Sequence, residues 1–152
     1  MIETGQLAPS ISLITDDGRF TLSEHIGKNV IIFFFPKADT SGCTKEAVAF
    51  SGLQAEFEAA NTIVIGISKD TAEKQAKFKE KHGLTCLLGA DIDGEACEAF
   101  GVWVEKSMYG KKYMGIQRST FLINTEQKIQ HIWNKVKVPG HAEEVLEVVK
   151  KL

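Results

Sequence analysis

Cys43 is the residue whose type and position most clearly suggest chemistry. It lies in the stretch FFFPKADTSGCTKEAVAF, where an apolar run ends at Pro36 and a helix is expected to begin near Thr40. Thr40 can act as the N-cap, which places Gly42 and Cys43 in the first helical turn. A thiolate there faces unpaired backbone N–H groups and the positive end of the helix dipole. The position therefore predicts a nucleophilic or redox-active thiolate.

The helical position of Cys43 also predicts its surroundings. Cys43 lies seven residues before Phe50, so both belong to the same face of the expected helix. The sulfur is then expected in a shallow pocket at the edge of the core, with Gly42 leaving the approach to it uncrowded. The simpler alternative is that Cys43 is a small apolar residue packed beneath the helix. Position alone leaves both possibilities open.

The elements that must position Cys43 follow from the apolar pattern. ISLITDDGRFTL has two short apolar pieces around Asp17-Gly18 and predicts a hairpin. The segments VIIFFF (residues 30–35) and TIVIGIS (residues 62–68) are continuous apolar runs, which predict strands buried on both faces. Further along the chain, STFLIN and KIQHIW predict two strands joined by a turn at residues 125–127.

Helices are predicted between and after these strands. One helix is expected to continue from Cys43 to Ala60, because apolar residues recur there at helical spacing. Asp70 and Glu73 have capping-box spacing, and Gly83 marks the end of the helix that they begin. DGEACEAFG fits a short helix. An amphipathic last helix is expected after Pro139, with its apolar face made by Val145, Leu146, Val149 and Leu152.

This order of elements predicts an α/β fold with a central mixed β-sheet flanked by helices and an N-terminal β-hairpin. No linker, repeat or low-complexity tract divides the chain, so residues 1–152 are expected to form a single domain. Its 43% hydrophobic and 25% charged residues are typical of globular proteins.

Charge and composition also limit the function. The net charge of −2 gives no indication of a nucleic-acid partner, and no apolar run approaches the ~20 residues that a membrane span needs. The N-terminal residues lack the features of a signal peptide, so a cytoplasmic location is expected. Three cysteines at irregular spacing do not suggest a secreted disulfide framework.

The stretch PKADTSGCTKEA resembles the active-site segment of peroxiredoxins, especially the peroxiredoxin Q (bacterioferritin comigratory protein) group. The family pattern of Pro, three residues, Thr or Ser, two residues and Cys matches at Pro36, Thr40 and Cys43. The resemblance continues in DIDGEACEAFGVW and MYGKKYMGIQRSTFLIN and covers nearly the whole chain. It implies a thioredoxin-like (peroxiredoxin) sandwich and a thiol-dependent peroxidase that reduces hydrogen peroxide and organic hydroperoxides in antioxidant defence.

The resemblance also implies roles for individual residues. Cys43 is the peroxidatic cysteine, which becomes a sulfenic acid. Thr40 holds the peroxide, and Pro36 shields the sulfur from bulk water. Arg118, in QRSTFLI, is the family's active-site arginine, and Glu46 is a supporting residue that fixes the loop or Arg118. No Gly-rich phosphate loop or flavin signature is present, so no bound cofactor is expected.

The chain departs from the family where a second cysteine is common. Many members carry a resolving cysteine five residues after the peroxidatic one, where this chain has Val48, and others carry it on the next helix, which here has none. Ser41 also replaces a proline that is common in the motif. Cys86 and Cys97 remain as possible resolving residues, although each is better interpreted as a packing thiol.

We therefore expect a one-cysteine mechanism in a monomer, with the sulfenic acid reduced by an external thiol from thioredoxin, glutaredoxin or glutathione. The alternatives are an atypical two-cysteine mechanism that uses Cys86 or Cys97, a cysteine hydrolase, and a non-catalytic redox sensor. A zinc site of His82, Cys86 and Cys97 has poor spacing, and no metal is expected. Lys111 and Lys112 are interpreted as part of a solvated turn.

Overall fold

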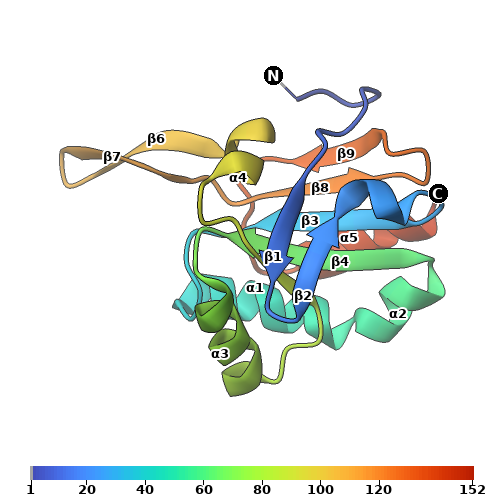
Figure 1. Cartoon of the computed structure of the whole chain (residues 1–152), viewed down its shortest axis with the longest axis horizontal. Helices are drawn as coiled ribbons and strands as arrows, with labels where there is room; N and C mark the ends of the chain where they lie inside the picture. The colour runs from blue at the N-terminus through green and yellow to red at the C-terminus, as the bar shows by residue number, and fades with distance from the viewer. Residues whose placement is uncertain (1) are drawn as a thin grey trace.

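The computed structural model describes residues 2–152, and a mixed β-sheet forms its centre (Figure 1). The strands of this sheet are β1 (Ser12–Thr15), β2 (Gly18–Thr21), β3 (Asn29–Phe34), β4 (Thr62–Ser68), β5 (Leu87–Ala90), β8 (Ser119–Ile123) and β9 (Ile129–Trp133). They are arranged in the order β2-β1-β5-β4-β3-β8-β9. Strands β3, β4 and β5 run parallel, whereas β1, β8 and β9 pair antiparallel with their neighbours. The predicted mixed sheet and N-terminal hairpin are confirmed.

The central strand β3 shows why the sheet needs cover on both faces. All six of its residues are buried. Val30, Ile32 and Phe34 pack in an apolar cluster on one face, whereas Ile31 and Phe33 pack in a second cluster on the other. A strand with no polar face is stable only where other elements cover each side of the sheet.

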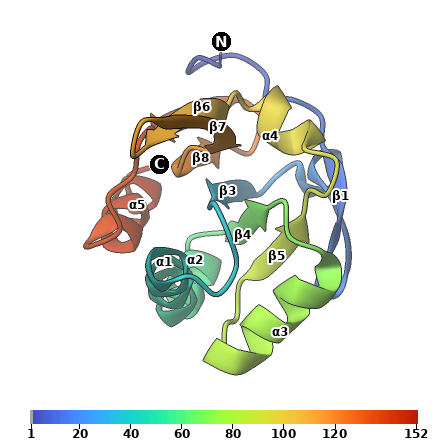
Figure 2. The ribbon, with the colours of Figure 1, turned by 90° about the vertical axis from the view of Figure 1, so that its left-hand side faces the viewer.

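Helices cover the two faces of the sheet unequally (Figure 2). The helices are α1 (Ser41–Gly52), α2 (Gln54–Ala59), α3 (Ala72–His82), α4 (Glu95–Ala99) and α5 (His141–Lys150). Side chains of α1, α2, α3 and α5 pack in the cluster that contains Phe33, whereas α4 packs in the cluster that contains Phe34. The face that carries α1 is therefore the thicker of the two layers.

The helix expected from Cys43 to Ala60 is divided in two. Helix α1 ends at Gly52 and α2 begins at Gln54, with Leu53 between them at φ −106° and ψ 11°. The N–H of Leu53 donates to the carbonyl of Phe50, three residues earlier, at 3.1 Å. Hydrogen bonds of this 3₁₀ type are typical of helix ends. Glycine is a poor helix former, so the break falls where the chain has least helical preference.

The start and end of α3 test the predicted capping box. Gly83 ends the helix in the left-handed conformation, as expected. Asp70 was the wrong choice of N-cap, because Thr71 occupies that position and its hydroxyl accepts the N–H of Lys74. Asp70 instead accepts a hydrogen bond of 2.6 Å from the hydroxyl of Ser68.

The last helix buries Val145, Leu146 and Val149, as the apolar pattern predicts. Leu152 does not extend this face, because it lies beyond the end of α5 and is exposed. The expected short helix corresponds to α4, and the two strands expected near the C-terminus correspond to β8 and β9. No helix within residues 2–152 is long and apolar enough to cross a bilayer.

Four elements were not anticipated from the sequence. They are β5, a short 3₁₀ helix (Leu22–His25), and the strands β6 (Trp103–Met108) and β7 (Lys111–Ile116). The last two pair only with each other and form an arm that projects from the sheet (Figure 1). Lys111 and Lys112 therefore belong to a strand, and the interpretation of both as a turn was wrong. The turn itself is Tyr109-Gly110, at φ 52° and 79°.

Candidate active site

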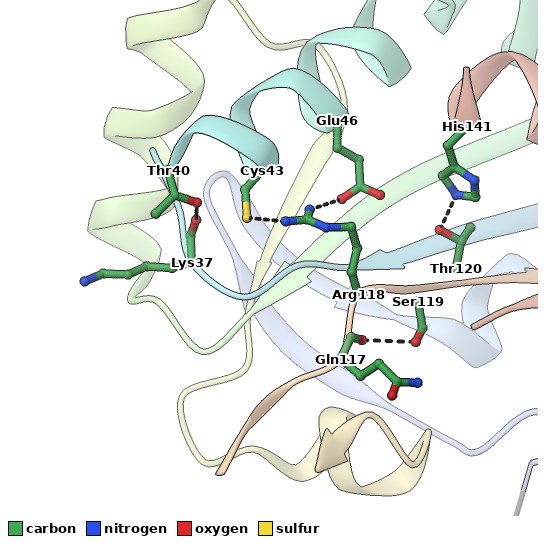
Figure 3. Close-up of polar contacts among 9 residues, drawn as sticks. All are labelled: Lys37, Thr40, Cys43, Glu46, Gln117, Arg118, Ser119, Thr120 and His141. Carbon is green, nitrogen blue, oxygen red and sulfur yellow. Dashed lines mark hydrogen bonds and ion pairs between the residues drawn. The ribbon is translucent and has the colours of Figure 1, made fainter. Parts of the chain in front are cut away.

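The loop between β3 and α1 brings Cys43 to one end of the sheet. Pro36 lacks an N–H and follows the last strand residues, so the sheet ladder cannot continue through it. Thr40 is the N-cap of α1, as predicted, in an extended conformation with φ −90° and ψ 158°. Its side chain accepts no N–H of the helix, however, and the hydroxyl instead donates to the carbonyl of Lys37 at 2.8 Å (Figure 3). The first-turn N–H groups of α1 are therefore free of a side-chain cap.

Cys43 faces the core. Its exposed fraction is 1%, and it packs in the same apolar cluster as Ala47 and Phe50, which follow it on α1. The predicted common face of Cys43 and Phe50 is confirmed. The sulfur is buried more deeply than the shallow pocket that the sequence suggested.

Arg118 connects Cys43 to Glu46 (Figure 3). Its Nη2 donates to the sulfur of Cys43 at 3.3 Å, and its Nη1 donates to Oε1 of Glu46 at 2.7 Å. Arg118 immediately precedes β8, which pairs antiparallel with β3 so that Ser119 lies opposite Phe34. The guanidinium therefore reaches the end of β3 from the neighbouring strand, and the structure brings these three predicted residues together.

Two charges in this group are strongly affected by burial. Burial raises the pKa of the Glu46 carboxyl to about 7, although the charge of Arg118 opposes this. Burial disfavours the charged form of Arg118, but Glu46 and Cys43 outweigh it and raise the pKa of the guanidinium. Oε2 of Glu46 is buried and has no hydrogen-bond partner among the described residues. When Glu46 holds a proton, Oε2 is therefore its natural site, because Oε1 accepts from Arg118.

Gly42 makes room for the guanidinium. A Cβ atom at this position would lie 3.2 Å from Nη2 of Arg118. The sequence suggested that Gly42 leaves the approach to the sulfur open. In the structure, the space beside Gly42 is instead occupied by the guanidinium of Arg118, which contacts the sulfur. A side chain here would push Arg118 away from Cys43.

The loop before α1 is anchored to α3 and to the end of β4. The N–H of Ala38 donates to Oδ2 of Asp70 at 2.8 Å. Asp39 has a left-handed backbone with φ 61° and contacts Lys81 Nζ at 2.8 Å and His82 Nε2 at 2.7 Å. These contacts hold the loop that leads into α1 against α3.

Lys106 is a further cation near the site that sequence reasoning missed. Its Cδ would lie 3.2 Å from a Cβ atom at Gly115, so its stem lies across the opposite strand of the arm. Burial and the charge of Arg118 lower the pKa of Lys106, and Cys43 opposes them. The sequence offers one signal for this position: Gly115 has no side chain and so leaves room for the stem of Lys106. A single glycine is a weak signal.

Cys86 and Cys97 lie in different surroundings from Cys43. Ser51, near the end of α1, donates to the sulfur of Cys86 at 3.6 Å, and burial raises the pKa of this thiol. Cys97 packs in the cluster on the opposite face of the sheet. Burial and Asp91 raise the pKa of Cys97 far above its ordinary value.

The remaining predicted residues make contacts away from the sulfur. Pro36 and Thr40 are exposed at the loop, and their expected roles stay predictions. His82 bonds Asp39, and His141 bonds the hydroxyl of Thr120 at 2.8 Å. Within residues 2–152, no group of three or more His, Cys, Asp or Glu side chains is placed to hold a metal ion.

Comparisons with known proteins agree with this geometry. The family model described as AhpC/TSA family matches residues 4–132. The chain is 47% identical to a putative peroxiredoxin bcp of Coxiella burnetii over 95% of this chain and 97% of that one, and 45% identical to peroxiredoxin Bcp of Bacillus subtilis over 99% and 97%. A bacterioferritin comigratory protein of Xanthomonas campestris, whose structures concern alkyl peroxide reduction, is 38% identical with a TM-score of 0.92 over 98% of each chain. The thioredoxin-like peroxiredoxin fold is thereby confirmed.

Proposed function

The chain belongs to the AhpC/TSA family and is a thiol-dependent peroxidase, and from this premise we propose that Cys43 is the sulfur that reduces the peroxide. One observation carries this assignment. Arg118 contacts the sulfur of Cys43 at 3.3 Å while Glu46 holds its other nitrogen. A fixed guanidinium at this position favours a thiolate and stabilises negative charge that develops beside it.

The proposed first step breaks the O–O bond of the peroxide. The Cys43 thiolate attacks one oxygen of ROOH, an S–O bond forms, and the other oxygen leaves with the electron pair as RO⁻. The sulfur is oxidised to the sulfenic acid, and the alkoxide, or hydroxide when R is hydrogen, takes up a proton. The first-turn N–H groups of α1 and Arg118 stabilise the leaving oxygen. We propose hydrogen peroxide and organic hydroperoxides as substrates.

We propose that Thr40 positions the peroxide. Its hydroxyl hydrogen is directed to the carbonyl of Lys37. The oxygen therefore remains available to accept a hydrogen bond from the O–H of the substrate. Pro36, which precedes this loop, is proposed to limit the access of water when the substrate is bound.

We propose that the sulfenic acid is reduced by an external thiol. Cys97 packs on the opposite face of the sheet from Cys43. Cys86 lies beside Ser51, which is about 12 Å along α1 from Cys43 at 1.5 Å per residue. Disulfides need Cα atoms within about 7 Å, so both pairings require local unfolding. The candidate reductants are thioredoxin, glutaredoxin and glutathione.

A cytoplasmic, monomeric protein is proposed with this mechanism. All three cysteines are free thiols, which suits a reducing compartment.

Peroxide consumption with excess dithiol tests the function. The wild-type protein should turn over many equivalents, and Cys43→Ser should lose turnover by at least about a thousandfold because the nucleophile is gone. Loss of a single equivalent without turnover would instead identify a redox sensor. Mass spectrometry of the oxidised protein should find a sulfenic acid on Cys43. A Cys43–Cys86 or Cys43–Cys97 disulfide as the main product would overturn the one-cysteine mechanism.

A further inference from the structure

A groove of about 450 Å³ lies beside the loop that leads into α1. Residues 37–39 form one wall of the groove, and α3 forms the other. Figure 2 shows the loop that leads into α1 and, across from it, α3. The apolar lining of the groove comes from Ala38 and Phe78. Its volume is within the range of about 300–1,000 Å³ that is typical of sites for small ligands.

The groove carries more positive than negative charge, although the whole chain has a net charge of −2. Four lysines and two aspartates line it: Lys37, Lys74, Lys77, Lys81, Asp39 and Asp70. Lys81 pairs with Asp39, and Lys77 pairs with Glu73 at 3.3 Å. Within residues 2–152, Lys37 and Lys74 form no ion pair, and they come from opposite walls. Two cations separated by an apolar surface therefore remain available to a ligand.

We propose that this groove binds glutathione as the reductant of the Cys43 sulfenic acid, an inference that rests on the proposed function. Glutathione carries two carboxylates, one ammonium and one thiol. Its two carboxylates match Lys37 and Lys74, the two lysines of the groove that have no acidic partner in the described part of the chain. Because this wall continues into Thr40 and α1, a thiol held in the groove is delivered to the segment that carries Cys43.

The loop has to move before such a thiol can reach the sulfur, since Cys43 is 1% exposed. Three side-chain contacts hold this loop: the partly exposed and therefore weak contacts of Asp39 with Lys81 and His82, and the hydrogen bond from the N–H of Ala38 to Asp70. Local opening of such a loop needs far less free energy than global unfolding. The groove binds its ligand on the segment that opens, which keeps the reductant next to the sulfur when it becomes accessible.

The redox balance of the proposed step requires two molecules of glutathione. The first attacks the sulfur of the sulfenic acid, an S–S bond forms, the S–O bond breaks, and the hydroxyl leaves as water with the thiol proton. The second attacks the glutathione sulfur of this mixed disulfide and releases the Cys43 thiolate and glutathione disulfide. The two electrons from two glutathione thiols thereby reduce the sulfenic acid.

Kinetics with two reductants of different charge test the groove. Lys37→Glu/Lys74→Glu should raise the KM for glutathione about tenfold, because two attractive charges become repulsive. The rate with dithiothreitol, which has no charge, should stay within about twofold, and this also shows that the variant is folded. The matched control is Lys28→Glu/Lys151→Glu, which makes the same change of charge at exposed positions outside the groove and should leave both rates unchanged.

Direct binding separates this proposal from the peroxidase function. S-methylglutathione keeps both carboxylates but has no free thiol, so its titration into the reduced protein measures binding without turnover. We expect saturable binding that Lys37→Glu/Lys74→Glu weakens about tenfold. An unchanged Kd in this variant, equal loss in the control, or turnover with thioredoxin but none with glutathione overturns the groove. Absence of turnover with dithiothreitol overturns the proposed function itself.

Discussion

Cys43 and Cys97 occupy the same position in two helices but have opposite electrostatic surroundings. Each is the third residue of its helix, α1 or α4, and each has an exposed fraction of 1% or less. At α4, Asp91 accepts the N–H groups of Ala96 at 3.0 Å and Cys97 at 2.8 Å. At α1, no side chain caps the helix and a guanidinium contacts the sulfur.

The comparison shows that a helix N-terminus does not by itself activate a thiol. Both helices direct their dipole at the cysteine, but at α4 the carboxylate of Asp91 uses the free N–H groups and places a negative charge beside the sulfur. A carboxylate also lies near Cys43, since Glu46 is one turn further along α1. There Arg118 lies between the carboxylate and the sulfur. The charge that contacts the sulfur therefore distinguishes the two sites.

Removal of the guanidinium should have the largest effect on this comparison. We expect Arg118→Met to lower kcat/KM for peroxide by about 10²- to 10³-fold, because one donor to the developing charge is lost. Steady-state kinetics with a saturating dithiol measure this. The matched control is Arg19→Met, since Arg19 bonds Ser12 on the N-terminal hairpin. An Arg118→Met variant within threefold of the wild type would show that charge at the sulfur does not control the reaction.

Glu46→Gln should change how stability depends on pH. Burial raises the pKa of Glu46 to about 7, above its value in the unfolded chain, so the folded state binds this proton more tightly. The free energy of unfolding of the wild type therefore falls as pH rises from about 4.5 to 7, by at most about 3 kcal/mol from this group. Gln has no titratable proton. The free energy of unfolding of the wild type minus that of Glu46→Gln should therefore fall over the same pH range.

Urea denaturation of both proteins across this pH range measures that difference. A difference that stays constant with pH would show that Glu46 keeps an ordinary pKa. In that case the carboxylate would be a full charge at neutral pH, and the two helices would differ less than described above.

Asp91→Asn should make the site at α4 more similar to the site at α1. The amide keeps one acceptor for the N–H groups but removes the negative charge, so the pKa of Cys97 should fall. The reaction of Cys97 with a small neutral methanethiosulfonate should become about tenfold faster at fixed pH. Cys43→Ser/Cys86→Ser is the background that isolates this thiol. An unchanged rate would mean that burial alone keeps Cys97 inert.

Gly42→Ala tests the room that α1 leaves for Arg118 and should have the smallest effect. The added Cβ meets Nη2 of Arg118 at 3.2 Å, so the guanidinium must move by a few tenths of an ångström. We expect kcat/KM to fall about threefold, since small misplacements of a positioning group reduce rates. Gly52→Ala on the same helix is the control, because a Cβ there meets nothing within 4 Å. Equal rates for both variants would contradict the proposed contact.

The sequence was sufficient for the hairpin, for the face of α1 that carries Cys43 and for every strand of the sheet except β5, because these follow from local apolar periodicity. It was also sufficient for the pairing of Arg118 with the site, but only through resemblance to a family. The direction of the Thr40 hydroxyl was not predictable, because a threonine at an N-cap can bond either its helix or its own loop.

The missed strands have a different cause. The β6–β7 arm is largely exposed and rich in lysine, so it lacks the alternation that marks a half-buried strand. The short two-residue turn at Tyr109-Gly110 was its one local signal.

The N-cap of α3 was misplaced by one residue for another reason. Asp70 and Thr71 are adjacent, and both residue types are good N-caps.

The pairing of β3 with β8 has a consequence for the protein during its synthesis. It joins Cys43 to a guanidinium that lies 75 residues later in the chain. At translation rates of about 5–20 residues per second, the ribosome exposes the cysteine for several seconds before its cation emerges. We therefore expect the nascent polypeptide to be insensitive to peroxide until the sheet is complete, which would spare unfinished chains from oxidative damage.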